Sequence, residues 1–170
     1  CRAELIKETE QGGAVADYLK NRGLAPEKAA FEPLGAVPDL SELQQALLHA
    51  GFAEQQIRTH IKLPGGVGES HRLSIAWRDP VGRVQGMTFR CLDAVPEQLP
   101  KYLNNKALNP DAPSFKSQLL FNLRQIRQGE EAILVEGPLD ALQCESVGIQ
   151  NVAAVGGGGK LSDTQLQHLV

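Results

Sequence analysis

The sequence predicts a mixed fold in two parts. An α+β part with helices and a small antiparallel sheet is expected over residues 1–130, and an α/β part over residues 131–170. Three observations support this prediction. Helical spacing of apolar residues dominates the first 60 residues, alternation with period two follows between residues 73 and 92, and strand and helix patterns alternate towards the end. Alternating strands and helices are typical of a parallel sheet.

The first helix that the spacing predicts covers residues 14–21. Val15, Tyr18 and Leu19 recur there at helical intervals, and Gly23 follows as a stop. A left-handed residue ends many helices, and glycine adopts that conformation at the lowest cost.

Further short helices are expected up to residue 60. Ala25-Pro26-Glu27 begins one of them, and Ser41-Glu42-Leu43-Gln44 has the pattern of a capping box ahead of a helix that ends at Gly51. A last turn or two would cover residues 53–59. Loops between these helices are indicated by Pro33, Gly35 and Pro38.

A β-hairpin is predicted after a glycine-rich loop in residues 62–70. Apolar residues alternate over residues 73–77, and a second strand covers residues 84–92. Between them, Asp79-Pro80-Val81-Gly82 has the residues of a type I turn.

Residues 93–118 are polar and contain four prolines, which predicts a long loop of the kind that is often functional. Residues 119–128 are expected to be helical, with Gly129 at the end. The last part then follows a strand–helix–strand–helix pattern, with pieces at 132–135, 138–147, 151–155 and 162–169. A second capping box, Ser162 to Gln165, opens the final helix.

Composition indicates a soluble protein of one large domain or two small ones. The chain has 170 residues, is 42% hydrophobic and 22% charged, and has no apolar run long enough to cross a membrane. It has no signal-peptide pattern, and its three widely spaced cysteines form no CxxC pair. Cys91 and Cys144 are expected to be small core residues. A cytoplasmic protein without structural zinc or disulfides in this chain is therefore expected. Because the chain lacks an initial Met and ends inside an apparent helix, we expect a fragment of a longer protein.

Positive charge is concentrated in the middle of the chain. Residues 56–128 contain eleven Lys and Arg against five Asp and Glu, while the whole chain has a net charge of −3. A basic middle suits a polyanion such as nucleic acid. A solvated surface of mixed charge is the alternative.

Two carboxylates stand where a strand is expected to end. Glu136 directly follows the apolar run Ile133-Leu134-Val135, which suits a buried strand, and Asp140 lies in the first turn of the next helix, which Pro138 opens. A carboxylate at a buried strand end is costly without a partner or a metal ion. Ligands of open α/β sheets bind at such strand ends, and Mg²⁺ usually takes one or two carboxylates. The alternative is a surface Glu beside an Asp that stabilises the helix N-terminus.

Two loops could hold phosphate. The glycine-rich segment 156–160 could offer backbone N–H groups, although it lacks the Walker A pattern and could equally be a flexible turn. Residues 100–106, with Lys116 further on, could grip a triphosphate or a nucleic-acid backbone, or could simply expose lysines to solvent. The four histidines show no metal-binding spacing.

Taken together, these motifs resemble the RNA-polymerase region of DnaG-type primases over about residues 14–170. Any one match is weak, but seven occur in the family's order. They are 17–24 (family pattern YL.RGL), 72–84 (R.MFPIRD..GRV), 86–90 (GFGGR), 101–104 (KYLN, unchanged), 115–123 (FKK…LYGL), 135–140 (VEGYMD) and 151–156 (NVVASLG).

The resemblance implies that residues 131–170 are the first half of a TOPRIM subdomain. Glu136 would be the catalytic TOPRIM glutamate and a ligand of Mg²⁺ or Mn²⁺, supported by Asp140. Nucleotide and template would be held by Arg90, Lys101, Tyr102, Asn104 and Lys116, with Arg72 as a weaker member. The implied partners are single-stranded DNA, ribonucleoside triphosphates and a replicative helicase, separate or fused. The implied reaction is RNA primer synthesis.

Departures from the family pattern keep other functions open. The family's Asp-x-Asp motif would lie after Val170, and its zinc-binding module is absent, so we expect this fragment alone to be inactive. Pro138 replaces a tyrosine, and the loop after Asn104 is longer than usual, which suggests a phage, plasmid or divergent primase. The alternatives are another TOPRIM enzyme, such as a topoisomerase or nuclease, and a non-catalytic module that binds single-stranded nucleic acid.

Overall fold

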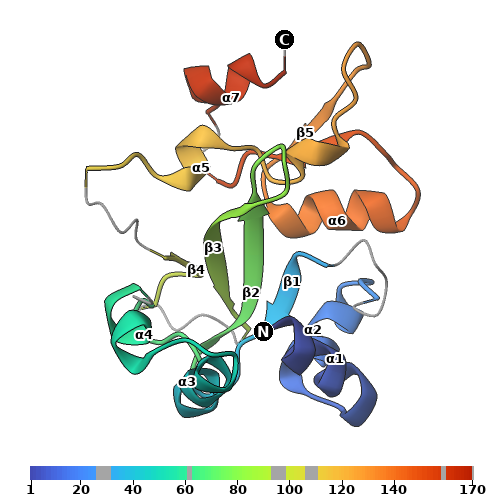
Figure 1. Cartoon of the computed structure of the whole chain (residues 1–170). Helices are drawn as coiled ribbons and strands as arrows, with labels where there is room; N and C mark the ends of the chain where they lie inside the picture. The colour runs from blue at the N-terminus through green and yellow to red at the C-terminus, as the bar shows by residue number, and fades with distance from the viewer. Residues whose placement is uncertain (26–31, 61–62, 93–98, 106–110, 158–159, 170) are drawn as a thin grey trace.

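The computed structural model describes residues 1–25, 32–60, 63–92, 99–105, 111–157 and 160–169 (Figure 1). The fold has a central antiparallel sheet with a group of helices at each side of its lower end (Figure 1). A small parallel sheet and its helices lie above the central sheet. The elements are α1 (Arg2–Gln11), α2 (Ala14–Asn21), β1 (Leu34–Ala36), α3 (Leu40–His49), α4 (Glu54–His60), β2 (His71–Arg78), β3 (Val84–Cys91), β4 (Tyr102–Asn104), α5 (Phe115–Gln118), η2 (Leu123–Gln125), β5 (Ile133–Val135), α6 (Pro138–Ser146), β6 (Val152–Ala154) and α7 (Asp163–Gln167).

The predicted hairpin is confirmed as the centre of the first sheet. β2 and β3 pair antiparallel, and the Gly82 N–H donates to the Asp79 carbonyl at 2.9 Å across the predicted turn. The Asp79 carboxylate accepts from the Arg83 N–H and side chain and from Gln85. Burial raises the pKa of Asp79, but these bonds outweigh it, so the net pKa is lowered.

The sheet has four strands, in the order β1-β2-β3-β4, where the sequence predicted only two. The predictions of loop at Pro33 and Gly35 and in residues 93–118 are therefore wrong for β1, for β4 and for the short helix α5. Residues 93–98 and 106–110 lie outside the described part. Both strands have three residues and lie at the edges of the sheet. Three residues are too few for an alternating pattern to show, so neither strand could be recognised from its sequence.

The helices of the first 60 residues agree with the prediction in part. Helix α2 matches residues 14–21, and Gly23 has a φ of 73° as the expected stop. The capping box at Ser41 is wrong: α3 begins at Leu40 with Asp39 as its N-cap residue and without a side-chain cap. The expected helix at Ala25-Pro26-Glu27 falls largely outside the described residues.

The predicted helix over residues 119–128 is also wrong. The backbone of Phe121 pairs with that of Ala154 in β6, with N–O distances of 2.8 and 3.0 Å, and only the short 3₁₀ turn η2 follows. Leu119, Leu120 and Phe121 are all buried, which three consecutive residues of a surface helix cannot be. Pairing with β6 buries both faces of this segment instead.

The βαβ unit is confirmed: β5 and β6 pair in parallel, with α6 between them in the chain. The Ser162–Gln165 capping box opens α7, with the Ser162 hydroxyl accepting from the Gln165 N–H at 3.1 Å. The expectation that β5 is buried is wrong, since Ile133 and Leu134 are 47% and 37% exposed. Within the described residues β5 pairs only with β6, so neither its outer edge nor much of its surface is covered.

One hydrophobic core joins the two parts of the chain. It contains apolar residues of α1, α2, β1 and β2 together with residues of α6 and β6, and Trp77 lies in it fully buried. Phe115 and Phe121 contact the Trp77 ring, with centroids 5.6 and 5.5 Å away. In the described part, no helix is both long and apolar enough to cross a bilayer. Cys91 is buried as expected, and Cys144 packs partly buried against this core.

Candidate functional site

Strand register places several polar residues on one face of the sheet. Arg90 of β3 lies opposite Tyr102 of β4, and Thr88 lies opposite Asn104. Side chains of directly opposed residues in an antiparallel pair point to the same face. The hairpin and the KYLN segment, which are separate in sequence, thus present one continuous polar surface.

Cations and aromatic rings interleave on this face in what we call the basic–aromatic cluster. Arg90 lies 4.9 Å from the Tyr102 centroid and 5.3 Å from that of Tyr18. Lys116 lies 6.0 Å from the Tyr102 centroid and 5.7 Å from that of Trp77. These distances suit cation–π interactions. The cluster consists of Tyr18, Arg22, Trp77, Arg90, Lys101, Tyr102 and Lys116.

Arg90 is the most unusual member of the cluster because it is a buried cation without a carboxylate. The residue is 7% exposed, and in the described part of the chain no Asp or Glu pairs with it. Its Nη1 donates to the Tyr102 hydroxyl, while its Nε and the nearby Tyr18 hydroxyl find no partner there. A buried charge is costly unless it is paired. An anionic ligand would supply the missing partner.

Burial shifts two further groups of the cluster. It lowers the pKa of Lys116 below the ordinary lysine value. It raises the pKa of Tyr102, although the neighbouring Arg90 partly opposes this, so the phenol keeps its proton at neutral pH. A protonated hydroxyl that accepts from Arg90 still has an O–H to donate.

Asn104 is tied to the cluster through a chain of hydrogen bonds. The indole N–H of Trp77 donates to Thr88 Oγ1, which donates to Asn104 Oδ1, each at 2.9 Å. The amide N–H₂ of Asn104, on an exposed residue, remains available for a ligand. The structure thus brings Arg90, Lys101, Tyr102, Asn104 and Lys116 together, as their predicted common role requires.

The strand end with Glu136 adjoins this cluster through the glycine-rich loop. The Glu136 carbonyl accepts the N–H groups of Gly156 and Gly157 at 2.8 and 3.2 Å. A Cβ built on Gly156 would lie 2.4 Å from Trp77 Cη2 and 3.3 Å from Lys116 Cε. Only glycine therefore allows the loop after β6 to pack against Trp77 and Lys116.

Both predicted carboxylates are exposed, which corrects the expectation of a buried acid at Glu136. Asp140 Oδ2 accepts the Gly137 N–H at 3.1 Å and so stabilises the N-terminus of α6, as the structural alternative predicted. In the described residues, no group of three or more His, Cys, Asp or Glu could hold a metal ion. Two carboxylates still fit a Mg²⁺ site that substrate phosphates and water complete.

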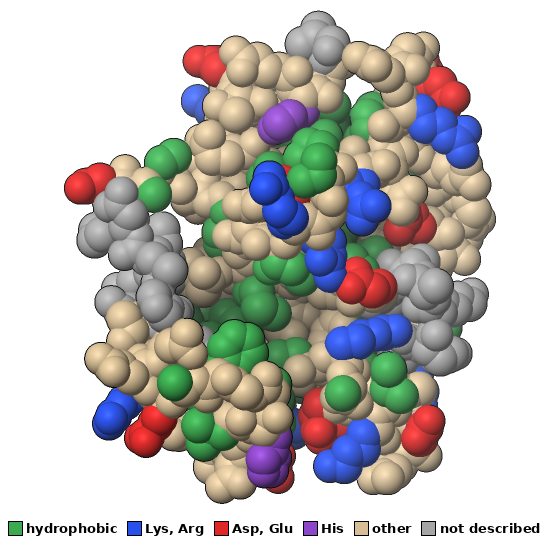
Figure 2. Space-filling view, in the orientation of Figure 1, with side chains coloured by type: hydrophobic (Ala, Val, Ile, Leu, Met, Phe, Trp, Pro, Cys, Tyr) green, Lys and Arg blue, Asp and Glu red, His purple; other side chains and the backbone are tan. Residues whose placement is uncertain are grey.

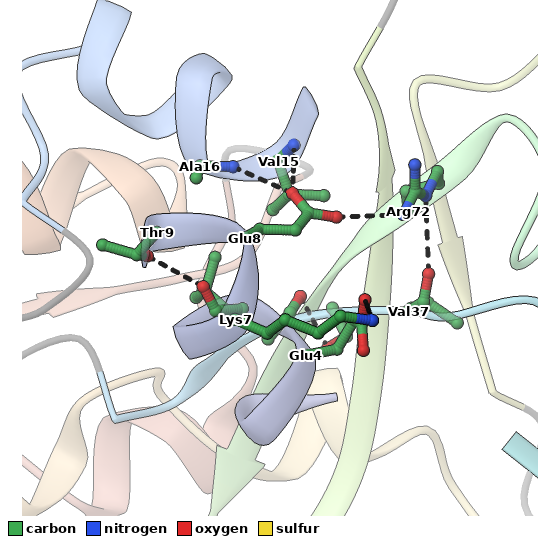
Figure 3. A network of polar contacts seen from close by, with 11 residues as sticks. Glu4, Lys7, Glu8, Thr9, Val15, Ala16, Val37 and Arg72 are labelled. Atoms are coloured by element: carbon green, nitrogen blue, oxygen red, sulfur yellow. Dashed lines mark hydrogen bonds and ion pairs between the residues drawn. The ribbon is translucent and has the colours of Figure 1, made fainter. Parts of the chain in front are cut away.

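Arg72 lies apart from the basic–aromatic cluster and is occupied by an ion pair (Figure 3). Its Nη2 donates to Glu8 at 2.9 Å, and Glu8 also accepts the N–H groups of Val15 and Ala16 at the start of α2. Glu8 is 6% exposed. The pair joins α1, α2 and β2, so Arg72 has a structural partner whatever else it contacts.

Tyr18 and Arg22 were not predicted as site residues, although the resemblance covered their helix. Arg22 lies 5.5 Å from the Tyr18 centroid, and Tyr18 in turn faces Arg90. Residues four apart on a helix share a face, so an aromatic residue in α2 and a basic residue at its C-cap, at that spacing, could have pointed to them.

A separate cavity of 300 Å³ lies at the end of β2. Figure 2 shows Lys and Arg side chains gathered over the turn between β2 and β3 and the segment beside it. Arg78 and Arg124 line the cavity, but Arg78 is bound by Glu32 at 2.6 Å and by the Gly82 carbonyl. Its charge is thus already compensated, unlike that of Arg90.

The chain is similar to bacterial DNA primases. A DNA primase of Aquifex aeolicus is 34% identical over 163 residues, which cover 90% of this chain and 31% of that protein. A DNA primase of Listeria innocua is 27% identical over 162 residues, which cover 88% of this chain and 25% of that protein. The chain thus spans less than a third of the length of these relatives. No family model matches it.

Solved structures of primases are also similar to this chain in fold. The zinc-binding and RNA-polymerase domains of Aquifex aeolicus primase match with a TM-score of 0.71 and 30% identity, over 92% of this chain and 40% of that one. The RNA-polymerase domain of the Mycobacterium tuberculosis primase matches with a TM-score of 0.73 and 21% identity, over 98% of this chain and 55% of that one. A DnaG primase catalytic domain bound to single-stranded DNA matches with a TM-score of 0.66 and 23% identity, over 96% of this chain and 53% of that one. At identities below 25%, the last two show the fold alone.

Proposed function

We propose that this chain is part of the RNA-polymerase region of a DNA primase and binds a nucleoside triphosphate and single-stranded template at the basic–aromatic cluster. The observation that best supports the proposal is Arg90, a buried cation that is held by Tyr18 and Tyr102 and that pairs with no carboxylate of the described residues. Phosphate is the anion that this set of groups suits, because guanidinium and ammonium groups bind its oxygens strongly.

The proposed reaction joins the 3′-hydroxyl of a growing RNA primer to the α-phosphate of a ribonucleoside triphosphate and releases pyrophosphate. Arg90 and Lys116 would neutralise the phosphate oxygens, and the protonated Tyr102 hydroxyl would donate to one of them. The Tyr18 and Tyr102 rings keep both cations in place and exclude water, which strengthens the electrostatic interaction. Catalysis of this kind consists mainly of positioning and charge stabilisation.

Mg²⁺ or Mn²⁺ is the proposed cofactor, with Glu136 as a ligand and Asp140 beside it. When bound, such an ion would neutralise the phosphates of the incoming nucleotide. Glu136 is exposed directly after β5, and its backbone carbonyl is bonded to the loop that packs on Lys116. Metal and basic cluster could therefore act on the same triphosphate.

Single-stranded DNA is the proposed macromolecular partner. One structural neighbour is a primase catalytic domain bound to single-stranded DNA. In this chain, exposed Lys101 and Asn104 adjoin the aromatic rings of the cluster, and such combinations of cation and ring hold backbone and base without strong sequence preference. A replicative helicase remains a prediction from the resemblance.

The substitution Glu136→Gln tests the proposal in the full-length primase. It should reduce incorporation of labelled ribonucleotides on a single-stranded template by at least about a thousandfold, since it removes a charge at the reacting phosphate. Glu131→Gln, an exposed glutamate five residues upstream, is the matched control and should leave the rate unchanged. Retained activity in the Glu136→Gln variant would exclude Glu136 as a catalytic residue.

A further inference from the structure

His71 is a fully buried histidine at the start of β2, and both of its ring nitrogens have partners. Nε2 lies 2.7 Å from the Pro100 carbonyl, 29 residues further on, and Nδ1 lies 2.9 Å from Ser70 Oγ. A carbonyl oxygen only accepts, so Nε2 must carry a hydrogen and donate it. A ring buried to this degree is stable only with such partners.

The carbonyl that His71 binds belongs to the residue directly before the KYLN segment. Pro100 has no N–H, so its carbonyl is its only backbone group able to form a hydrogen bond. Next in the chain, the Lys101 carbonyl accepts from the Cys91 N–H at 3.1 Å, and Tyr102 begins β4 opposite Arg90. His71 itself lies opposite Cys91 in the hairpin. It therefore connects the hairpin to the start of β4.

Strand β4 needs such an anchor because it is short. It has three residues, lies at the edge of the sheet and, within the described part of the chain, pairs only with β3. Edge strands of this length gain little from their own ladder of hydrogen bonds. Yet the position of Tyr102 against Arg90 depends on the register of this strand.

We infer that His71 is a positioning residue that fixes β4 and thereby holds Lys101 and Tyr102 against Arg90. Its N–H on Pro100 sets where the strand begins, and its Ser70 contact sets the plane of the ring. Among the described residues, His71 makes no hydrogen bond or cation–π contact with the basic–aromatic cluster, and it acts through β4. Its consequence for nucleotide affinity rests on the proposed function, whereas its effect on β4 does not.

Two polar substitutions separate this role from a general contribution to packing. His71→Gln places an amide N–H₂ near the position of Nε2 and should keep the bond to Pro100. His71→Asn places its amide near Nδ1, too short to reach Pro100, although it is equally polar. His49, which is exposed on α3, provides the control substitution His49→Asn.

Two measurements on the 170-residue chain report β4 directly. Hydrogen exchange of the Cys91 and Asn105 amides reports the β3–β4 ladder, since these bond to the carbonyls of Lys101 and Met87. Trp77, the only tryptophan of the chain, is linked to Asn104 through Thr88, so its fluorescence follows the same strand. We expect exchange at least about tenfold faster, and altered emission, in His71→Asn, with near-normal values in His71→Gln and His49→Asn.

Binding of ATP with Mg²⁺ completes the test. The dissociation constant should rise about tenfold in His71→Asn and return to within about threefold of the unmodified value in His71→Gln. Equal amide exchange in His71→Asn, His71→Gln and His49→Asn would overturn the inference. An equal loss of exchange protection in His71→Asn and His71→Gln would do the same. If exchange changes as expected while the unmodified chain binds no ATP, the positioning role stands and the proposed function fails at this site. His71→Gln keeps the test valid if His71→Asn does not fold.

Discussion

Arg90 is a residue at which stability and binding are expected to oppose each other. Among the described residues, one hydrogen bond and two aromatic rings offset the cost of burying its charge. Arg90→Met keeps much of the volume and removes the charge, so the free energy of unfolding should stay the same or increase by about 1–2 kcal/mol. The affinity for ATP should fall at least about tenfold, because a charged hydrogen-bond donor is lost.

Urea denaturation and calorimetric titration measure the two quantities. Arg124→Met is the matched control, because Arg124 is exposed and makes no hydrogen bond or ion pair with any described residue. A variant at Arg90 that loses stability but keeps its affinity would show that the cation serves the fold and not a ligand.

Lys116 is a second single residue with an expected effect, here on how the affinity for ATP depends on pH. Burial lowers its pKa in the folded chain, so the ammonium charge is lost at a lower pH than in an exposed lysine. Affinity for ATP should be constant below this pKa and decline above it. Because the unfolded chain keeps the proton more tightly, Lys116 should also make the fold more stable as pH rises towards the ordinary lysine value.

Lys116→Arg tests this dependence, since arginine stays charged across the whole range. The decline in affinity at alkaline pH, followed by titration at a series of pH values, should disappear in this variant. An unchanged alkaline decline would assign it to another group.

Among the elements, the loop after β6 has the strictest steric requirement. A methyl group at Gly156 would overlap Trp77 at 2.4 Å, and the residue has a φ of 89°. Gly156→Ala should therefore displace the loop, lower the free energy of unfolding by more than about 2 kcal/mol, and change Trp77 fluorescence. Gly157→Ala, with a φ of 100° but no atom within 4 Å, should cost only about 1–2 kcal/mol.

Thermal or urea unfolding compares the two variants. Equal losses of stability would mean that the strained backbone, and not the contact with Trp77, decides the effect. The contact is the part that matters for the site, because it places the strand end of Glu136 next to Lys116.

Elements with a strong internal pattern were predictable and short ones were not. The β2–β3 hairpin, α2 and the βαβ unit follow the spacing of their apolar residues, and Ser162 caps α7 as expected. Strands β1 and β4 have three residues each, too few for a period to show. Leu119–Phe121 has a helical composition, but pairing with Ala154 decides its conformation.

At the scale of the whole molecule, the hydrophobic core crosses the boundary that we place near residue 130. Phe121 contacts Trp77 on one side and pairs with β6 on the other. We propose that the two parts, although distinct in topology, unfold together. Phe121→Ala should lower the free energy of unfolding by about 3–5 kcal/mol and keep a single transition.

Trp77 fluorescence and far-ultraviolet circular dichroism should give coincident unfolding curves for this variant and for the unmodified chain. Leu166→Ala, at a residue that is 46% exposed on α7, is the control and should change stability by less than about 0.5 kcal/mol. Two separate transitions would show that the boundary divides independent folding units.

The sequence by itself determined the order of the main elements, the turn at Asp79, the βαβ unit and the residue types of the site, because these depend on local patterns. The tertiary structure alone decided which charges are compensated. Asp140 is occupied by the Gly137 N–H and Arg72 by Glu8, whereas the partners of Arg90 within the described residues are aromatic rings and a hydroxyl. The roles of Tyr18 and His71 also depend on distant partners, because Tyr18 faces Arg90 and His71 binds the Pro100 carbonyl, 29 residues away. Long-range packing sets burial and pairing, and no local pattern specifies either of them.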